Sequence, residues 1–268
     1  MKKRAIWIML LAIVAGLASS VMAGTIYYDD FSGSSGSWLN GRTPTTTTES
    51  ATWTASANAG WRASGEVTGI ENVHQSAFLP FQLGSASFPT GYVYELSVTM
   101  NVTSDSNGDW FALGFTGTLG VTAPFYNSEL AASGWVLQRG PDTGGNYQDE
   151  SYYVPGPVLS GMAYYGKIAG PQTWKIVLDT TAAQWTVQWF VNDTPLAAPY
   201  TYSTNPTINY VALGQYSTAT GSVDDFQLTV VPEPATIGML ITGGAIAVFR
   251  RCWRKLQITR NKFQTISK

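Results

Sequence analysis

The chain has 268 residues, of which 44% are apolar and 13% aromatic, so it can bury a sizeable core and is not dominated by disorder. Only 12% of the residues are charged, and residues 24–231 hold five basic against sixteen acidic residues, a net of −11. So acidic a surface repels phosphate backbones, which argues against nucleic acid as a partner. The one cysteine, Cys252, lies outside this acidic region, so the region has neither an internal disulfide nor a thiol catalyst.

Residues 1–23 have the three parts of a secretory signal peptide. Basic residues 2–4 precede an apolar run over residues 5–18, and Val21, Met22 and Ala23 form a small-residue cleavage site before Gly24. The apolar run is shorter than the ~20 residues of a membrane span. We therefore expect a signal helix that is removed on export, with an uncleaved anchor helix as the alternative.

Residues 24–230 are predicted to form one all-β domain, because apolar and polar residues alternate in several stretches. The apolar residues of three such stretches are Tyr94, Leu96, Val98 and Met100, then Trp185, Val187, Trp189 and Val191, then Phe226, Leu228 and Val230. This alternation is typical of half-buried antiparallel strands. Residues 43–48, rich in threonine, are expected to be a loop or an edge strand. The economical architecture is a two-sheet antiparallel sandwich of the jelly-roll type.

The order of these elements resembles the concanavalin-like jelly roll of laminin-G-type and legume-lectin-type domains. The residues that carry the resemblance are Tyr28 to Phe31, Trp110 to Phe115, Trp174 to Asp179 and Val223 to Phe226. In such domains the first and last strands commonly pair. The resemblance therefore implies that the two Asp-Asp-Phe segments, at residues 29–31 and 224–226, lie together.

Residues 105–109 are the one candidate metal site. Asp105, Asn107 and Asp109 provide alternate oxygen donors around a glycine, as in the first half of a calcium loop. The twelfth position of an EF-hand loop would be Thr116, which excludes an EF-hand and leaves a lectin-type calcium site. The alternative is an Asx-Gly hairpin turn between the strands that contain Met100 and Trp110. Calcium is thus the only cofactor that the sequence suggests, since clustered zinc ligands are missing from it.

Carbohydrate binding requires aromatic rings beside amide or carboxylate groups. Trp174, Trp185 and Trp189 alternate with apolar residues and are expected in the core. Aromatic residues in polar stretches are better candidates, and residues 142–153 hold most of them. The candidate glycan-binding residues are Trp38, Trp61, Asn146, Tyr147, Gln148, Asp149, Tyr152 and Tyr153.

Catalysis is not predicted. A jelly-roll glycosidase of this kind needs Glu-x-Asp-x-x-Glu to place its acids on one strand face, and no glutamate before Pro232 begins that pattern. Residues 164–167 are similar to one block of jelly-roll polysaccharide lyases, but the only histidine is His74 and the neighbouring lyase residues are not recognisable. The Ser-His-Asp mechanism would depend on the same histidine.

The C-terminal end has an ordered set of features. Val231, Pro232, Glu233 and Pro234 precede fifteen apolar residues, 235–249, and then the basic residues Arg250, Arg251, Arg254 and Lys255. Fifteen residues make only about 22 Å of helix, short for a ~30 Å bilayer core. The basic residues predict that this end stays on the cytoplasmic side as a membrane stop.

This order resembles the PEP-CTERM sorting signal of Gram-negative bacteria that make extracellular polysaccharide. The resemblance covers residues 231–255 and implies that the Pro-Glu-Pro motif is processed by exosortase, a membrane protease. An ordinary tail anchor is the alternative. Such signals usually end after their basic cluster, whereas this chain continues through a basic, cytoplasmic tail at residues 256–268.

The sequence therefore predicts an exported, non-enzymatic protein. It would be held transiently at the inner membrane and then reside at the cell surface or in the extracellular matrix of a Gram-negative bacterium. Its expected partners are an exosortase-type protease and extracellular polysaccharide. A structural or adhesive matrix protein without a glycan ligand is the alternative, and a polysaccharide lyase is a more distant one.

Overall fold

The described part of the chain consists of strands and their connections. A computed structural model describes residues 24–32, 37–56, 62–63, 67–68, 75–103, 110–123, 125, 132–140, 151–156, 163–166, 169–216 and 219–231. The signal-peptide and sorting segments predicted at the two ends, including both predicted helices, lie outside these residues, apart from Val231. Within the described residues no helix is long and apolar enough to cross a membrane.

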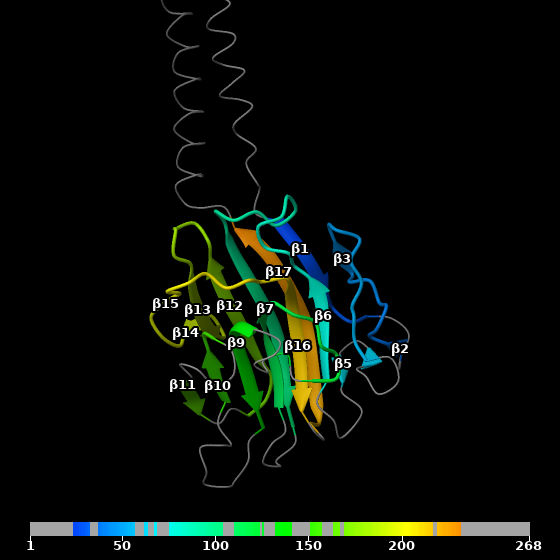
Figure 1. Cartoon of the computed structure of the whole chain (residues 1–268). Helices are drawn as coiled ribbons and strands as arrows, with labels where there is room; N and C mark the ends of the chain where they lie inside the picture. The colour runs from blue at the N-terminus through cyan, green and yellow to red at the C-terminus, as the bar shows by residue number, and fades with distance from the viewer. Residues whose placement is uncertain are drawn as a thin grey trace, which may run out of the picture. The chain divides into compact units, whose positions relative to one another are not determined.

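The strands form two antiparallel sheets that lie one in front of the other (Figure 1). The first sheet runs in the order β14 (Thr194–Pro195), β13 (Thr186–Val191), β12 (Gln172–Asp179), β7 (Val93–Val102), β17 (Gly221–Val231), β5 (Val67–Thr68), β4 (Arg62–Ala63) and β2 (Ser37–Trp38). β1 (Gly24–Asp29) also pairs with β17 and with β3 (Thr46–Thr47), and β15 (Tyr200–Thr201) pairs with β13. The second sheet runs in the order β11 (Ala163–Gly166), β10 (Ser151–Val154), β9 (Ala132–Arg139), β8 (Trp110–Thr116), β16 (Tyr210–Tyr216) and β6 (Gln75–Pro80).

The first sheet has one buried and one solvent-facing side, as the alternation predicted. β7 alternates half-buried and buried residues along its whole length, and β13 does the same. In β17 the apolar residues Phe226, Leu228 and Val230 are buried. The prediction of an all-β, two-sheet antiparallel sandwich is confirmed for the described residues.

The core lies between the two sheets. The Phe81 ring lies 5.0 Å from the ring of Tyr94, in the first sheet, and 5.7 Å from the ring of Phe115, in the second sheet. Trp174 extends from β12 to the second sheet, where its Nε1 donates a 2.8 Å hydrogen bond to Gln138 Oε1. Phe115 and Gln138 thus identify the inner face of the six-stranded sheet.

The first and last strands pair, as the jelly-roll resemblance implied. β1 and β17 are antiparallel neighbours, and Asp29 lies opposite Phe226. The Tyr28 hydroxyl donates a 3.0 Å hydrogen bond to Asp225, which has a φ of 51° beside a bulge in β17. The two Asp-Asp-Phe segments therefore do lie together.

The hairpin alternative for residues 105–109 is wrong. β7, which contains Met100, pairs with β12 and β17, whereas β8, which begins at Trp110, pairs with β9 and β16. The connection between β7 and β8 therefore passes from one sheet to the other. Asp105, Asn107 and Asp109 themselves lie outside the described residues.

Candidate functional site

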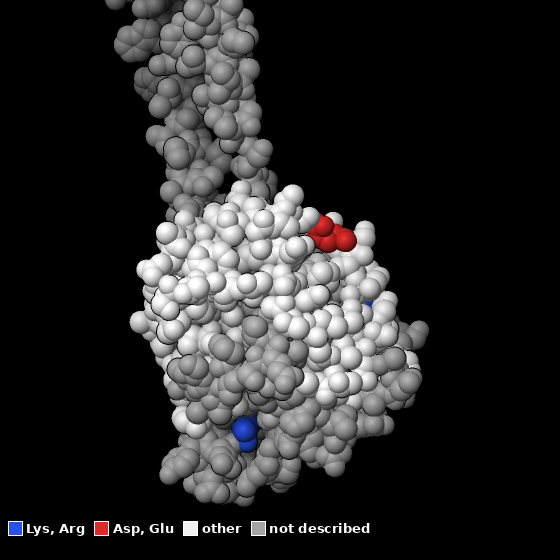
Figure 2. Space-filling view, in the orientation of Figure 1, with Lys and Arg blue, Asp and Glu red and all other residues white. Residues whose placement is uncertain are grey.

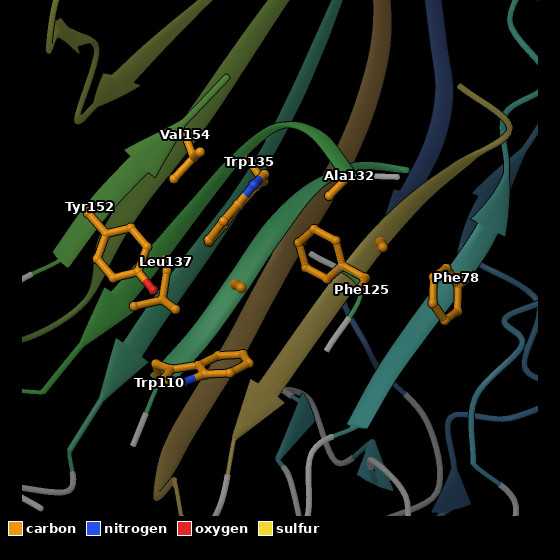
Figure 3. Packing of buried hydrophobic residues seen from close by; sticks show 10 residues of the cluster. Phe78, Trp110, Phe125, Ala132, Trp135, Leu137, Tyr152 and Val154 are labelled. Atoms are coloured by element: carbon orange, nitrogen blue, oxygen red, sulfur yellow. The ribbon is translucent and has the colours of Figure 1, made fainter. Parts of the chain in front are cut away.

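The outer face of the six-stranded sheet carries a cluster of buried aromatic side chains. The register places two adjacent cross-strand rows on it. They are Phe78, Ala212, Gly114, Trp135 and Val154, then Ser76, Gly214, Ala112, Leu137, Tyr152 and Tyr164. Within these two rows small residues occupy the middle strands β8 and β16 and most of the large ones lie on the strands beside them, while Trp110 lies at the start of β8 (Figure 3). This face therefore has a hollow along its middle, with aromatic walls.

The chain fills part of this hollow with Phe125. A Cβ atom added to Gly214 would lie 2.9 Å from the Phe125 ring, and one added to Gly114 would lie 2.9 Å from the same ring and 2.4 Å from Trp135 Cβ. Only glycine leaves room for the ring at both positions. Ser76 holds the segment in place, because its Oγ donates to Ala123 O at 2.7 Å and accepts from Phe125 N at 2.9 Å. The β6–β16 half of this face is thus closed by the protein itself.

A line of aromatic rings leads from Phe125 to the edge of the sheet. The ring centroids of Phe125 and Trp135 are 6.4 Å apart, those of Trp135 and Tyr152 are 5.6 Å apart, and those of Tyr152 and Tyr164 are 6.0 Å apart. All three pairs have the edge-to-face geometry that aromatic rings prefer. The first three residues are buried, whereas Tyr164 on the edge strand β11 is 46% exposed. The line therefore ends in an aromatic side chain at the surface.

Arg139 lies beside this line. It is the last residue of β9, opposite Trp110 of β8, and its guanidinium carbon lies 6.0 Å from the centre of the Tyr152 ring. Burial raises the pKa of the Tyr152 hydroxyl, and the charge of Arg139 and its hydrogen bond to that hydroxyl partly offset the rise. Arg139 itself is only half-buried, so a cation in an aromatic setting reaches the surface here.

The structure brings together only part of the predicted glycan-binding set. Tyr152 lies on the outer face, opposite Tyr164 on the neighbouring strand. Tyr153 points to the inner face, where its ring lies 5.0 Å from that of Trp189. Trp38 is exposed, but it belongs to β2 in the other sheet.

The remaining predicted glycan-binding residues, Trp61, Asn146, Tyr147, Gln148 and Asp149, lie outside the described residues. The connection that contains residues 146–149 joins the end of β9 to the start of β10. Its two ends are adjacent, since Arg139 N donates a 3.1 Å hydrogen bond to Ser151 Oγ. That connection therefore begins and ends beside Arg139.

Sequence reasoning missed Arg139 and named Tyr164 only as part of a lyase-like block. A signal for Arg139 was present, because it is a single cation at the end of an apolar stretch, Trp135 to Leu137, in an acidic domain. The sequence did not show that Tyr164 and Arg139 are neighbours of the same tyrosine. His74, the residue on which a lyase or Ser-His-Asp mechanism would depend, lies outside the described residues.

A second polar cluster surrounds Asp29 at the end of β1. Its buried carboxylate accepts hydrogen bonds from Arg42 Nη2 at 2.9 Å, from Trp53 Nε1 at 2.8 Å and from Phe31 N at 2.9 Å. Next to it, hydrogen bonds from Thr45 and Ser32 lower the pKa of Asp30 to about 2. The Asp29 carboxylate is saturated by protein donors, so this cluster fastens β1 to the following loop.

One face of the described surface holds few charges. In Figure 2 nearly all of the described atoms on the face shown belong to uncharged residues. No group of three or more histidine, cysteine, aspartate or glutamate residues that could hold a metal ion occurs among the residues with a described placement.

No protein-family model and no curated relative matches the chain. The structure is similar to the carbohydrate recognition domain of Emp47p, with a TM-score of 0.44 and 12% identity over 80% of this chain and 99% of that one. It is also similar to an endo-1,3-beta-glucanase from Streptomyces sioyaensis, with a TM-score of 0.42 and 12% identity over 81% of this chain and 99% of that one. A winged bean acidic lectin matches with a TM-score of 0.39 and 13% identity over 79% of this chain and 99% of that one.

Proposed function

We propose that this protein binds carbohydrate, without cleaving it, at the β9–β11 end of the outer face of the six-stranded sheet. The observation that carries the proposal is the line of aromatic rings that ends in the exposed Tyr164. Sugar rings bind to aromatic surfaces held rigidly in place, with polar groups beside them to fix their orientation. Tyr152 packs against Tyr164 across β10 and β11, and Arg139 supplies a polar group beside Tyr152.

The residue types of this face favour binding over hydrolysis. Its positions in the described strands carry aromatic, small and aliphatic side chains, Ser76 and Arg139. A glycosidase needs two carboxyl groups about 5–9.5 Å apart across the sugar bond. The described outer face provides a platform for a sugar ring rather than that pair.

Two neighbouring tyrosines allow a matched test. Tyr164 and Tyr165 are exposed to nearly the same extent, 46% and 43%, but Tyr165 points to the other face of β11 and packs against Trp174. We expect Tyr164→Ala to abolish polysaccharide binding by the full-length protein on a glycan array, and Tyr165→Ala to retain it. The array is run with and without calcium, to test residues 105–109 separately. Equal loss in both variants, or no sugar signal from the unaltered protein, would refute the proposal.

A structural or adhesive role without a glycan ligand is the second candidate. The observation that favours it is that β11 is an edge strand with two exposed tyrosines, since such edges can pair with another chain. In that case both tyrosine variants would weaken self-association in analytical ultracentrifugation, and no sugar would bind.

We further propose that the protein is exported and processed at its C-terminal end. Support comes from the last strand, β17, which ends at Val231, so the Pro-Glu-Pro residues 232–234 follow the folded domain directly. An exosortase would then meet its motif in an extended segment. Intact-mass measurement of protein released from cells should show loss of everything after about residue 234. Released protein that still carries Lys268 would contradict processing there.

A further inference from the structure

We propose that the sugar bound at this site is an acidic one, and that Arg139 recognises its carboxylate. This inference rests on the proposed function and names the class of ligand. It begins from the charge balance of residues 24–231, where acidic residues outnumber basic ones about three to one. In such a domain each cation has many carboxylates available as partners.

Two of the cations with described side chains have such a partner. Arg42 forms an ion pair of 2.9 Å with Asp29, and Lys175 one of 2.6 Å with Asp193. Within the described ranges no carboxylate lies at ion-pair distance from Arg139. Its described neighbours include Trp110, Ser151 and Tyr152, whose hydroxyl it hydrogen-bonds, and among the described residues its buried Nε has no hydrogen-bond partner.

A half-buried guanidinium without an anion is costly, because burial removes the water that solvates its charge. An anionic ligand would supply the partner that the described residues do not. The guanidinium is a planar fork that binds a planar carboxylate through two parallel hydrogen bonds. The Tyr152 ring lies 6.0 Å from the Arg139 guanidinium carbon and 6.0 Å from the Tyr164 ring, so a carboxylate-binding group and a ring-binding surface share one neighbour. A pyranose ring that carries a carboxylate, a uronic acid, satisfies both groups at once.

The test uses three polysaccharides and three variants of the full-length protein. The polysaccharides are polygalacturonate, neutral dextran and dextran sulfate, and calorimetry measures their binding at low and at physiological ionic strength. Arg139→Met removes the charge, and Arg139→Lys keeps the charge but removes the fork. Lys175→Met is the matched control, since it removes one positive charge from the other sheet.

At physiological ionic strength, where salt screens the repulsion between the acidic domain and a polyanion, we expect polygalacturonate to bind at least about tenfold more tightly than dextran. Arg139→Met should lose this preference. Arg139→Lys should retain only a small part of it, and Lys175→Met should retain all of it. In the unaltered protein, galacturonate but not galactose should shift the nuclear magnetic resonance signal of the Arg139 Nε–H group. This last measurement does not depend on the folding of any variant.

Each other outcome identifies which proposal fails. If dextran binds as tightly as polygalacturonate and Tyr164→Ala abolishes both, the sugar site stands and the acidic specificity is refuted. If dextran sulfate binds best and Lys175→Met weakens binding as much as Arg139→Met, the attraction is general electrostatics and carboxylate recognition is refuted. If none of the three polysaccharides binds, both proposals are refuted.

Discussion

Replacing Asp29 by alanine should lower the free energy of unfolding by about 3–5 kcal/mol, the usual cost of breaking a buried ion pair from one side. The carboxylate is fully buried and accepts hydrogen bonds from Arg42, Trp53 and Phe31. Its loss leaves the Arg42 charge without its acid and two N–H groups without acceptors. Arg42 keeps only a 2.6 Å hydrogen bond to Ser32 O. The cost should therefore lie well above that of a surface substitution.

Urea denaturation followed by tryptophan fluorescence measures this free energy. The matched control is Asp193→Ala, which breaks the ion pair with Lys175, where the carboxylate is 87% exposed; we expect almost no change. The double variant Asp29→Ala/Arg42→Met should cost clearly less than the sum of the two single variants, because each single change leaves an unpaired group that the double change removes. Additive costs, or an Asp29→Ala cost below about 1 kcal/mol, would refute this account of the cluster.

Two further predictions concern polar groups elsewhere in the domain. Gln75 and Gln215 face each other across β6 and β16, and their buried amide atoms have no hydrogen-bond partner within the described part of the chain. Gln75→Met/Gln215→Met should therefore leave the free energy of unfolding unchanged or raise it by up to about 2 kcal/mol. A loss in urea denaturation would show that these amides have partners. Thr45→Ala should raise the pKa of Asp30 from about 2 toward its ordinary value of 3.8, as read from the carboxyl carbon shift in nuclear magnetic resonance. Because the folded pKa is lowered, Asp30 stabilises the fold above its ordinary pKa, and this stabilisation is lost as the pH falls toward 2. An unchanged pKa in the variant would contradict the hydrogen bond from Thr45.

The first sheet was predictable from sequence because one of its sides meets solvent. The residues of β7, β13 and β17 alternate between buried and half-buried, which leaves a period of two in the sequence. The six-stranded sheet was harder to predict. All seven residues of β8 and seven of the eight residues of β9 are buried, so both of their faces are covered and the alternation disappears.

The candidate site could be predicted only in part, because register and sheet membership are long-range properties. In the sequence, polar surroundings made Trp38, Tyr152 and Tyr153 equally good candidates for glycan binding. Strand pairing then assigned Trp38 to the other sheet, and the alternation of β10 turned Tyr153 to the inner face. The adjacency of Arg139 and Tyr164 to Tyr152 depends on the pairing of three strands, β9, β10 and β11, and the sequence does not specify that pairing.

Phe125 explains why the exposed part of the site lies at the edge of the sheet. Glycines at positions 114 and 214 interrupt two otherwise well-filled strands, and a glycine within a strand usually marks the close approach of another group. That group is the Phe125 ring, held over the glycines by Ser76. A fully buried phenylalanine contributes about 3–5 kcal/mol relative to alanine, so a sugar would not displace it readily. The middle of the outer face is therefore core, and a ligand on this face would have to bind near β9–β11, where Tyr164 and Arg139 reach the surface.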